Sequence, residues 1–489
     1  MASRASVVRE VDGLYEMTTT MENSQLYNED LAPTPIAGRT WGFYDMASVW
    51  VGMAVCVPTW MLGASMIAAG FTWWVAVLTV MLGNLIVLVP MILNSFAGTK
   101  YGIPFPVFLR ASFGVYGSVL PSILRTGVAC GWFGIQTYLG GTAIDGLLNA
   151  LGGGWSTIPA HEWIAFGVFW LMNVAVIWYS PVGKAQPGIK LLADWSAPIL
   201  ILIGIGLLVW AVSNAGGLGP MFAAPMKADW SLWPPFLTAM VAYWATLALC
   251  ISDLTRYCKS QSVQVWGQIA GMPTTMTFYS FLGVAVTSCT LVIFGEAVWD
   301  PIQVTIKTGN ALFIIIGLIF FILATLTTNV AANVVAPAYG FSNLAPKYIS
   351  WRTGAMITAV IGIVMMPWRL METYGAYIFD WLGNYGGFLG PIAGIMVADY
   401  WICRRGRLKL EDLYKAEGQY RYWSGWNPAG LIALVVAVIV AFLPLDFNRD
   451  WRWFVGAIVA GLVYWVVYEF YVVREFKGEA EAIGRVPTR

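Results

Sequence analysis

The stretch SVWVGMAVCVPTWMLGASM, residues Ser48 to Met66, is apolar along almost its whole length but has a proline near its centre. A helix of about 20 such residues crosses the roughly 30 Å of hydrocarbon in a bilayer. Pro58 lacks a backbone N–H and clashes with the carbonyl group four residues earlier, which frees backbone polar groups near mid-membrane. Such groups persist in a bilayer only where protein buries them or where they line a cavity. The stretch therefore predicts a membrane helix broken at mid-depth, with a simple kink in a packed helix as the alternative.

The composition indicates that most of the chain lies in the same membrane. Of the 489 residues, 58% are apolar and 11% are charged, with a mean hydropathy of +0.69. A soluble domain of this length needs far more charge to cover its surface. We predict twelve membrane spans near residues 45–69, 73–97, 117–145, 161–179, 191–213, 233–253, 267–294, 310–335, 353–368, 374–401, 428–445 and 453–472.

Basic residues predict the orientation of these spans. If the N-terminus is cytoplasmic, 21 lysines and arginines fall on the cytoplasmic side and five fall on the outer side, and Arg125 lies inside the third span. This asymmetry predicts an integral protein of the plasma (inner) membrane with both termini in the cytoplasm. The basic residues therefore report topology, and the net charge of +1 points to no nucleic-acid partner.

The first and sixth spans both differ from ordinary membrane helices. The sixth has a polar and aromatic centre, with Tyr243 and Trp244, but no glycine or proline there. Such a pair among twelve spans favours two five-helix inverted repeats plus two further helices, with the ligand between discontinuous helices. We predict a flexible cytoplasmic tail over residues 1–40, a ten-helix transport core over 41–401, a basic cytoplasmic loop over 402–425, two additional transmembrane helices over 426–473, and a cytoplasmic tail over 474–489.

The residue sets that enzymes use are missing. The six cysteines are scattered without metal-site spacing, and the only histidine, His161, opens the fourth predicted span. The sequence shows no nucleophile–histidine–acid set and no phosphate-binding loop, which a membrane-embedded enzyme would need in some form. Neither tail is large enough to be the signalling domain of a sensor. We therefore expect no enzyme activity and no cofactor.

The third span contains a pair suited to a flat ligand. Trp132 and Gln136 are four residues apart and so share one helical face. An indole plane beside a carboxamide can stack on a heterocycle and pair with its N–H and C=O edge. Trp244 is placed similarly in the sixth span. Most of the 26 tryptophans must belong to the interfacial belt or to packing, which is the alternative for these two as well.

The eighth span becomes polar without becoming charged, in ATLTTNVAANVVAPA from Ala324 to Ala338. Asn333 lies on the same face as the asparagine four residues earlier, and buried carboxamides need partners. The hydroxyls of Thr327 and Thr328, with carbonyls freed in the first span, could form a cage of neutral oxygens for Na⁺. Such hydroxyls also commonly bond within their own helix. A proton is the alternative coupling ion, carried by an aspartate at a span end.

Several strings in the chain are similar to those of the nucleobase–cation symporters, which include bacterial hydantoin, allantoin and uracil permeases. They are NEDLAPTPIAGRTW, KYGIPFPVFLRASFG, WFGIQTYLGG, TTNVAANVVAPAYG and LGPIAGIMVADYW, within a resemblance that covers roughly residues 28–470. The resemblance implies an all-α, leucine-transporter-like fold of two five-helix inverted repeats that works by alternating access.

The resemblance also implies roles for individual residues. It places the ring of the substrate against Trp132, Gln136, Trp244 and Asn333, and it places sodium ligands at Gly52, Val55, Ala324, Thr327 and Thr328. Two positions depart from the hydantoin permease: Cys56 replaces a glutamine of the first helix, and Tyr243 replaces a glycine. Both border the expected ligand, so the resemblance does not single out hydantoin, and a ring of a different size is an alternative.

Together these features predict a secondary active transporter that imports a small flat nitrogen heterocycle, such as allantoin, uracil, hydantoin or a related nucleobase, by cation symport. Its partners are then the heterocycle, the coupling cation and the lipid bilayer. The alternative is a passive facilitator or channel for similar small polar solutes. A channel would show a continuous polar stripe along several helices, whereas the polar residues here gather in one mid-membrane layer.

Overall fold

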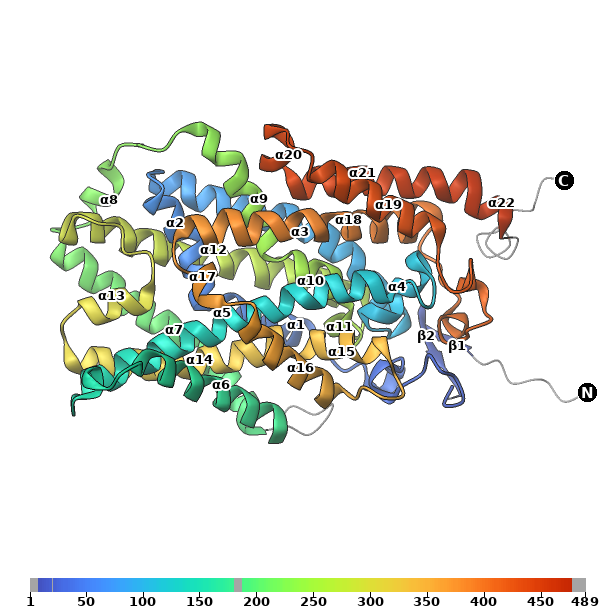
Figure 1. Ribbon diagram of the computed structural model, residues 1–489, viewed down its shortest axis with the longest axis horizontal. Coiled ribbons are helices and arrows are strands. Elements are labelled where there is room, and N and C mark those ends of the chain that lie inside the picture. The colour runs from blue at the N-terminus through green and yellow to red at the C-terminus, as the bar shows by residue number, and fades with distance from the viewer. Residues whose placement is uncertain (1–7, 20, 180–186, 477–489) are drawn as a thin grey trace, which may run out of the picture.

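The computed structural model describes residues 8–19, 21–179 and 187–476, and nearly all of its regular structure is helical (Figure 1). The long helices run along the longest axis of the molecule. A two-stranded antiparallel hairpin, β1 (Val8–Val11) and β2 (Leu14–Met17), lies at the same end as the last helix, α22 (Val473–Glu475). We call this the terminal end and the opposite one, where α8 (Gly219–Ala223) and α13 (Pro301–Lys307) lie, the distal end.

Each of the twelve predicted spans coincides with a helix or an interrupted helix. In order they are α1 (Phe43–Ala54) with α2 (Val57–Ala68); α3 (Trp73–Tyr101); α5 (Val119–Leu151); α6 (His161–Tyr179); α7 (Pro187–Asn214); α9 (Trp233–Tyr243) with α10 (Ala245–Cys250) and α11 (Ser252–Thr255); α12 (Gln261–Phe294); α14 (Ala311–Asn333) with α15 (Val335–Leu344); α16 (Trp351–Val364); η5 (Ala376–Gly383) with α18 (Asn384–Val397) and η6 (Ala398–Cys403); α19 (Pro428–Ala441); and α21 (Arg452–Val467) with η9 (Tyr468–Val472).

Among the described residues, eight helices are long and apolar enough to cross a membrane, and the bent pair α1 and α2 makes a ninth span. The other three predicted spans are the 33-residue α5 and the shorter apolar helices α16 and α19. Short elements connect them: α4 (Phe105–Phe113), α17 (Pro367–Leu370), α20 (Asp446–Asp450), η1 (Glu29–Leu31), η2 (Ile36–Gly38), η3 (Trp155–Thr157), η4 (Trp230–Leu232), η7 (Leu410–Tyr414) and η8 (Gln419–Arg421).

The first span is broken where its proline indicated. α1 ends at Ala54 and α2 begins at Val57, and the two helices are bent by 56°. Between them Cys56 is extended, with φ −150° and ψ 162°, and its N–H donates to the Ala54 carbonyl. A continuous helix would direct that N–H to the carbonyl of Gly52. Pro58 lies in the first turn of α2, where a missing N–H costs no helical hydrogen bond.

Two further spans are interrupted, the sixth without a glycine or proline at the break and the eighth three residues before Pro337. In the sixth, α9 ends at Tyr243 and α10 begins at Ala245, with Trp244 between them at φ −97° and ψ 5°. In the eighth, α14 passes into α15 at Val334, where φ is −113° and ψ is −45°. Both breaks fall beside residues that the sequence selected as ligand contacts.

Helix α5 is packed on several sides, against α6, α14, α15 and α16. Close approach depends on glycine at several of its positions, two of which lie beside Trp132. A Cβ at Gly134 would lie 2.2 Å from the Gly362 carbonyl of α16, and one at Gly131 would lie 2.2 Å from the ring of Trp381. The small residues beside Trp132 thus leave room for a neighbouring helix and an aromatic ring.

The N-terminal segment differs from the prediction. The sequence predicted a flexible tail over residues 1–40, whereas the described residues of this segment fold against the helices at the terminal end. Arg39 is buried, and its guanidinium donates to the carbonyl of Thr99 at 2.9 Å. Leu31 is also buried, and its carbonyl accepts a 2.7 Å hydrogen bond from the hydroxyl of Tyr414. The local sequence, which is polar and contains prolines, predicts no fixed structure. Contacts with distant parts of the chain hold this segment in place instead.

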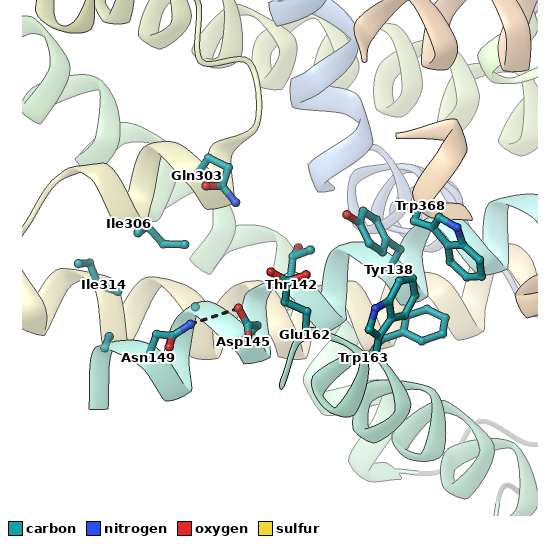
Figure 2. A pocket seen from close by; sticks show the side chains of 13 residues that line it. Tyr138, Thr142, Asp145, Asn149, Glu162, Trp163, Gln303, Ile306, Ile314 and Trp368 are labelled. Atoms are coloured by element: carbon teal, nitrogen blue, oxygen red, sulfur yellow. Dashed lines mark hydrogen bonds between the residues drawn. The ribbon is translucent and has the colours of Figure 1, made fainter. Parts of the chain in front are cut away.

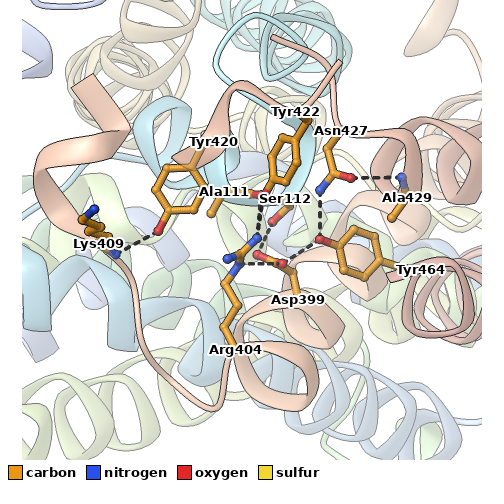
Figure 3. A network of polar contacts seen from close by, with 10 residues as sticks. All are labelled: Ala111, Ser112, Asp399, Arg404, Lys409, Tyr420, Tyr422, Asn427, Ala429 and Tyr464. Atoms are coloured by element: carbon orange, nitrogen blue, oxygen red, sulfur yellow. Dashed lines mark hydrogen bonds and ion pairs between the residues drawn. The ribbon is translucent and has the colours of Figure 1, made fainter. Parts of the chain in front are cut away.

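A buried polar network ties the last helices to the core at the terminal end (Figure 3). The carboxylate of Asp399 accepts hydrogen bonds from Arg404 Nε at 2.8 Å, Ser112 Oγ at 3.0 Å and the Tyr464 hydroxyl at 2.6 Å. Arg404 Nη2 also donates to the Tyr422 hydroxyl at 2.6 Å. Because both charges are buried, each depends on the other and on these neutral partners. The network therefore joins α4, η6 and α21.

Candidate substrate-binding site

Three aromatic side chains from two helices meet where the first and sixth spans are broken. The ring centroids of Trp132 and Tyr243 are 5.2 Å apart, and those of Tyr243 and Trp244 are 5.0 Å apart. Both contacts are edge-to-face, at 72° and 84°. All three side chains are buried. The phenol ring of Tyr243 therefore contacts both indoles that the sequence proposed as the two faces of a ring-binding slot.

Polar atoms of this cluster are left without partners. In the described structure, no hydrogen bond is made by the indole N–H groups of Trp132 and Trp244 or by the amide oxygen of Gln136. The polar group next to the Trp132 N–H is the hydroxyl of Tyr385, which itself donates to the carbonyl of Ala242 at 2.9 Å. Buried polar groups in folded proteins nearly always have a partner. Two donors and one acceptor thus remain available to a molecule held beside these rings.

The two positions that depart from the hydantoin permease contact each other. The Cys56 thiol lies 3.4 Å from the Tyr243 hydroxyl, and Thr59 Oγ1 lies 2.9 Å from the same hydroxyl. Cys56 and Thr59 are 3.3 Å apart, and the Gln136 carboxamide also interacts with the thiol. This arrangement holds the phenol ring in place from the start of α2.

The asparagines of the eighth span form a chain of hydrogen bonds. Asn333 Nδ2 donates to Asn329 Oδ1 at 3.1 Å. Asn329 Nδ2 in turn donates to the Phe133 carbonyl and to Thr137 Oγ1, each at 3.3 Å, and to Asn173 Oδ1 at 3.1 Å. Asn329 therefore joins α14 to α5 and α6, and it orients Asn333 one turn further along.

The proposed cation ligands come from elements that are in contact. α1 packs against α14, and Thr327 and Thr328 are both buried. Thr327 Oγ1 donates to the carbonyl of Ala324 at 3.0 Å, which is the bond within a helix that the sequence left as an alternative. Gly52 and Val55 lie beside the break between α1 and α2. A cation site at these five residues stays a prediction.

The chain matches, over residues 33–468, a family of permeases for cytosine/purines, uracil, thiamine and allantoin. The chain belongs to this permease family. The permease is 41% identical over 470 residues to the purine-uracil permease NCS1 of Arabidopsis thaliana, covering 90% of this chain and 78% of that one. It is 37% identical over 465 residues to the allantoin permease of Bacillus subtilis, covering 91% of this chain and 94% of that one.

Solved structures show the same fold. Mhp1, a nucleobase-cation-symport-1 family transporter, in a closed conformation with bromovinylhydantoin bound, matches the permease with a TM-score of 0.80 at 27% identity, over 94% of this chain and 100% of that one. A Na⁺-coupled sialic acid symporter shares the fold alone, with a TM-score of 0.62 at 12% identity over 93% of each chain. The predicted family and all-α membrane fold are confirmed, and the chain is a transport protein and not an enzyme.

Sequence reasoning missed three aromatic neighbours of the cluster. The ring of Trp132 lies 6.2 Å from those of Tyr377 and Trp381, and Trp50 lies 5.2 Å from Trp244. The Tyr377 hydroxyl donates to the carbonyl of Pro58 at 3.3 Å, next to the break in the first span. The spacing of four residues between Tyr377 and Trp381 was the signal in the sequence, since it places both on one helical face.

A separate cavity of about 530 Å³ lies along the last turns of α5, whose side chains line it together with residues of α6, α13, α14 and α17 (Figure 2). It is lined by Tyr138, Thr142, Asp145, Gly146, Asn149, Ala150, Glu162, Trp163, Phe166, Gln303, Ile306, Ile314 and Trp368. Asp145 accepts hydrogen bonds from Asn149 at 3.2 Å and from Trp155 at 2.8 Å, and it pairs with His161 at 2.6 Å. The cavity begins on α5 about one half-turn beyond Gln136 and continues to the distal end of that helix.

Proposed function

We propose that the permease is a secondary active importer that carries a small flat nitrogen heterocycle, such as allantoin, uracil, hydantoin or a related nucleobase, by cation symport with alternating access. One observation carries the proposal: two indole N–H groups and an amide oxygen, all buried and unpaired in the described structure, lie beside breaks in membrane helices. A ring with adjacent N–H and C=O groups supplies the matching acceptors and donor.

The arrangement supports a ring held against Trp132, with Gln136 and Asn333 pairing with its edge. Trp244 contributes from the other side of Tyr243. The printed names of the relatives, a purine-uracil permease and an allantoin permease, agree with ligands of this size. The bromovinylhydantoin bound to Mhp1 is a substituted heterocycle of the same class.

The asymmetry of basic residues predicts that both termini, and with them the terminal end, face the cytoplasm. The distal cavity then faces outward, and we infer that substrate enters through it, because its lining on α5 begins at Tyr138, two residues beyond Gln136. Import thus proceeds from the distal to the terminal end.

Ligand binding is expected to raise the stability of the purified permease in a compound-dependent way. A ligand that binds only the folded state adds about 2.7 kcal/mol to the free energy of unfolding at 100 times its Kd. The measurement is a thermal-shift screen in detergent against allantoin, uracil, hydantoin and purine bases, with sodium or with choline. Glucose, which offers no flat ring, is the control ligand. A chain that none of the heterocycles stabilises in either buffer would contradict the proposal.

Thr328→Ala is expected to weaken heterocycle binding in sodium and to change nothing in choline. Removal of one oxygen ligand lowers sodium affinity, and coupled sites typically differ by roughly five- to 150-fold in affinity. The matched control is Thr325→Ala, a buried threonine on the asparagine-bearing face of the same helix. An equal loss of affinity in both buffers would assign Thr328 to packing and favour a proton as the coupling ion.

Concentrative uptake separates the importer from a passive facilitator. Liposomes with an inward sodium or proton gradient should accumulate the heterocycle above its outside concentration, and collapse of the gradient should release it. A facilitator would equilibrate the heterocycle in both conditions.

A further inference from the structure

A second set of buried polar side chains lies outside the aromatic cluster. It is carried by α5 and by the sixth span, the same segments that carry Trp132 and Trp244. Arg125 is on α5, seven residues before Trp132, which is about 10 Å along a helix. Asp253 is on α11, and Arg256 is the first residue after the end of that helix. Both come after Trp244 in the interrupted sixth span. We call Arg125, Asp253 and Arg256 the inner cluster.

The inner cluster lies on the terminal side of the aromatic cluster. α5 starts at the terminal end, where the N–H of Tyr116 donates to the carbonyl of Gly425 in the loop after η8. Tyr257, next to Arg256, accepts a backbone hydrogen bond from Trp41 of the N-terminal segment. Tyr339 on α15, six residues after Asn333, packs its ring 5.3 Å from the Arg256 guanidinium. Helix α5 and the sixth span thus continue from the ring-binding candidates into the inner cluster, and α15, which follows α14, packs against it.

The three charged side chains are buried but only partly bonded. Their exposed fractions are 1% for Arg125, 4% for Asp253 and 5% for Arg256. Arg125 Nη2 donates to the Cys250 sulfur at 2.9 Å, and Asp253 Oδ1 accepts from the N–H of Phe105 at 2.7 Å. Arg256 Nη2 donates to the hydroxyl of the adjacent Tyr257 at 2.8 Å.

Their remaining polar atoms have no partner in residues 8–19, 21–179 and 187–476. These atoms are Nε and Nη1 of Arg125, Nε and Nη1 of Arg256, and Oδ2 of Asp253. Three buried hydroxyls nearby in the sequence are likewise unpaired in that part of the chain: Ser122, Thr126 and Ser252. The charges of both arginines act on Asp253, although in the described part of the chain neither guanidinium bonds to its carboxylate.

This arrangement costs free energy unless another molecule completes it. Buried donors and charges without partners are strongly unfavourable, and a buried cation in excess attracts an electron-rich ligand. In each arginine the free donors Nε and Nη1 lie on different edges of the guanidinium, and each can donate to a carbonyl or carboxylate oxygen. Asp253 Oδ2 offers one acceptor beside them. The unpaired donors of the arginines and the unpaired acceptor of Asp253 therefore fit a planar ligand edge on which C=O groups flank an N–H.

We propose that the inner cluster is a second binding station for the transported heterocycle, where Arg125 and Arg256 receive its carbonyl oxygens and Asp253 receives a ring N–H. This inference rests on the proposed function. It adds a second binding site, which substrate occupies after it leaves Trp132 and Trp244 and before it reaches the cytoplasm. The break at Trp244 lies between the ring-binding residues and the inner cluster along the sixth span, so a change of bend there would alter the path between the two stations.

The test compares Arg125→Gln with the unchanged chain, both purified at full length and reconstituted in liposomes. The probes are uracil or hydantoin, whichever the unchanged chain takes up faster, and its two monothio analogues, in which sulfur replaces one carbonyl oxygen as a weaker acceptor. Arg125→Gln should slow uptake of the oxo compound by about tenfold or more, the value of a hydrogen bond to a charged group. The same variant should also lower the ratio of the uptake rate of the oxo compound to that of the thio compound, for at least one analogue, by a similar factor.

The ratio distinguishes binding from packing, because a merely structural arginine affects oxo and thio compounds alike. Arg404→Gln is the matched control: Arg404 is equally buried but bonded to Asp399 and Tyr422 (Figure 3), so its loss should lower thermal stability and leave the ratio unchanged. If Arg125→Gln does not insert, Arg125→Lys keeps the charge without the planar fork and should narrow the ratio in part.

An Arg125→Gln or Arg125→Lys variant with an unchanged ratio would overturn the inference. This result leaves the proposed function intact when the unchanged chain still takes up the probe and Trp132→Ala still blocks uptake. A chain that neither binds nor takes up any heterocycle of the panel would instead remove the proposed function, and this inference with it.

Discussion

Trp132→Ala is expected to abolish saturable uptake of the heterocycle while the protein still inserts in the membrane. Stacking of a base on an aromatic side chain is worth about 1–3 kcal/mol, or roughly five- to 150-fold in affinity. The substitution also removes the ring that Tyr243, Tyr377 and Trp381 contact, so neighbouring side chains can move into the site. Radiolabelled uptake into cells or liposomes measures the effect, with surface expression recorded in parallel.

Two controls separate lost binding from lost folding. Trp132→Phe keeps an aromatic face and should retain measurable uptake at reduced affinity. Trp266→Ala removes an indole that is 59% exposed on α12 and should leave uptake unchanged. Normal affinity in Trp132→Ala would rule out the indole as a face of the site. If the folded fraction of Trp132→Ala falls in proportion to its uptake, the result would indicate a packing role for Trp132.

Tyr243→Gly is expected to change which heterocycles the permease accepts. The phenol ring contacts both Trp132 and Trp244, and its hydroxyl is held by Cys56 and Thr59. Its removal opens space between the indoles, so hydantoins with a bulky aromatic substituent should gain affinity by about tenfold or more. Small rings should lose affinity because they no longer fill the site, at about 0.8 kcal/mol per lost CH₂-sized contact. Competition for uptake by substituted and unsubstituted hydantoins measures this change in preference.

Tyr243→Phe tests the part that the hydroxyl contributes. It keeps the ring, so bulky hydantoins should stay excluded, while Cys56 and Thr59 lose a hydrogen-bond partner and the ring gains freedom to tilt. An unchanged order of preference in Tyr243→Gly would refute the idea that this phenol limits substrate size. Large-to-small substitution in a buried site commonly costs about 3–5 kcal/mol, so the binding assays need a folded fraction determined for each variant.

The asparagines of the eighth span show where sequence reasoning was sufficient and where it was not. Two carboxamides at i and i+4 in an apolar helix had to find partners, and they did. The separate roles of the two asparagines were not predictable. Asn329 bonds to α5 and to Asn173 on α6, and Asn333 bonds to Asn329. The partner atoms lie 156 to 196 residues away along the chain.

Arg125 provides a second example. Its place inside a predicted span was visible in the sequence and marked it as unusual, because charge in a membrane helix needs a partner or a function. The identity of its neighbours was not visible. Cys250, Asp253 and Arg256 belong to an interrupted span more than 120 residues later, and only the packing of α10 against α5 brings the groups together.

The sequence by itself determined the membrane spans, the break at Pro58 and the residue types available at mid-depth. These depend on properties of short segments: hydropathy over about 20 residues, and the steric clash of a proline with its own helix. The tertiary structure alone decided the contact of Cys56 with Tyr243 and the folding of the N-terminal segment onto the terminal end. Each of these joins segments far apart in the chain, and their free energy comes from helix packing that no local pattern encodes.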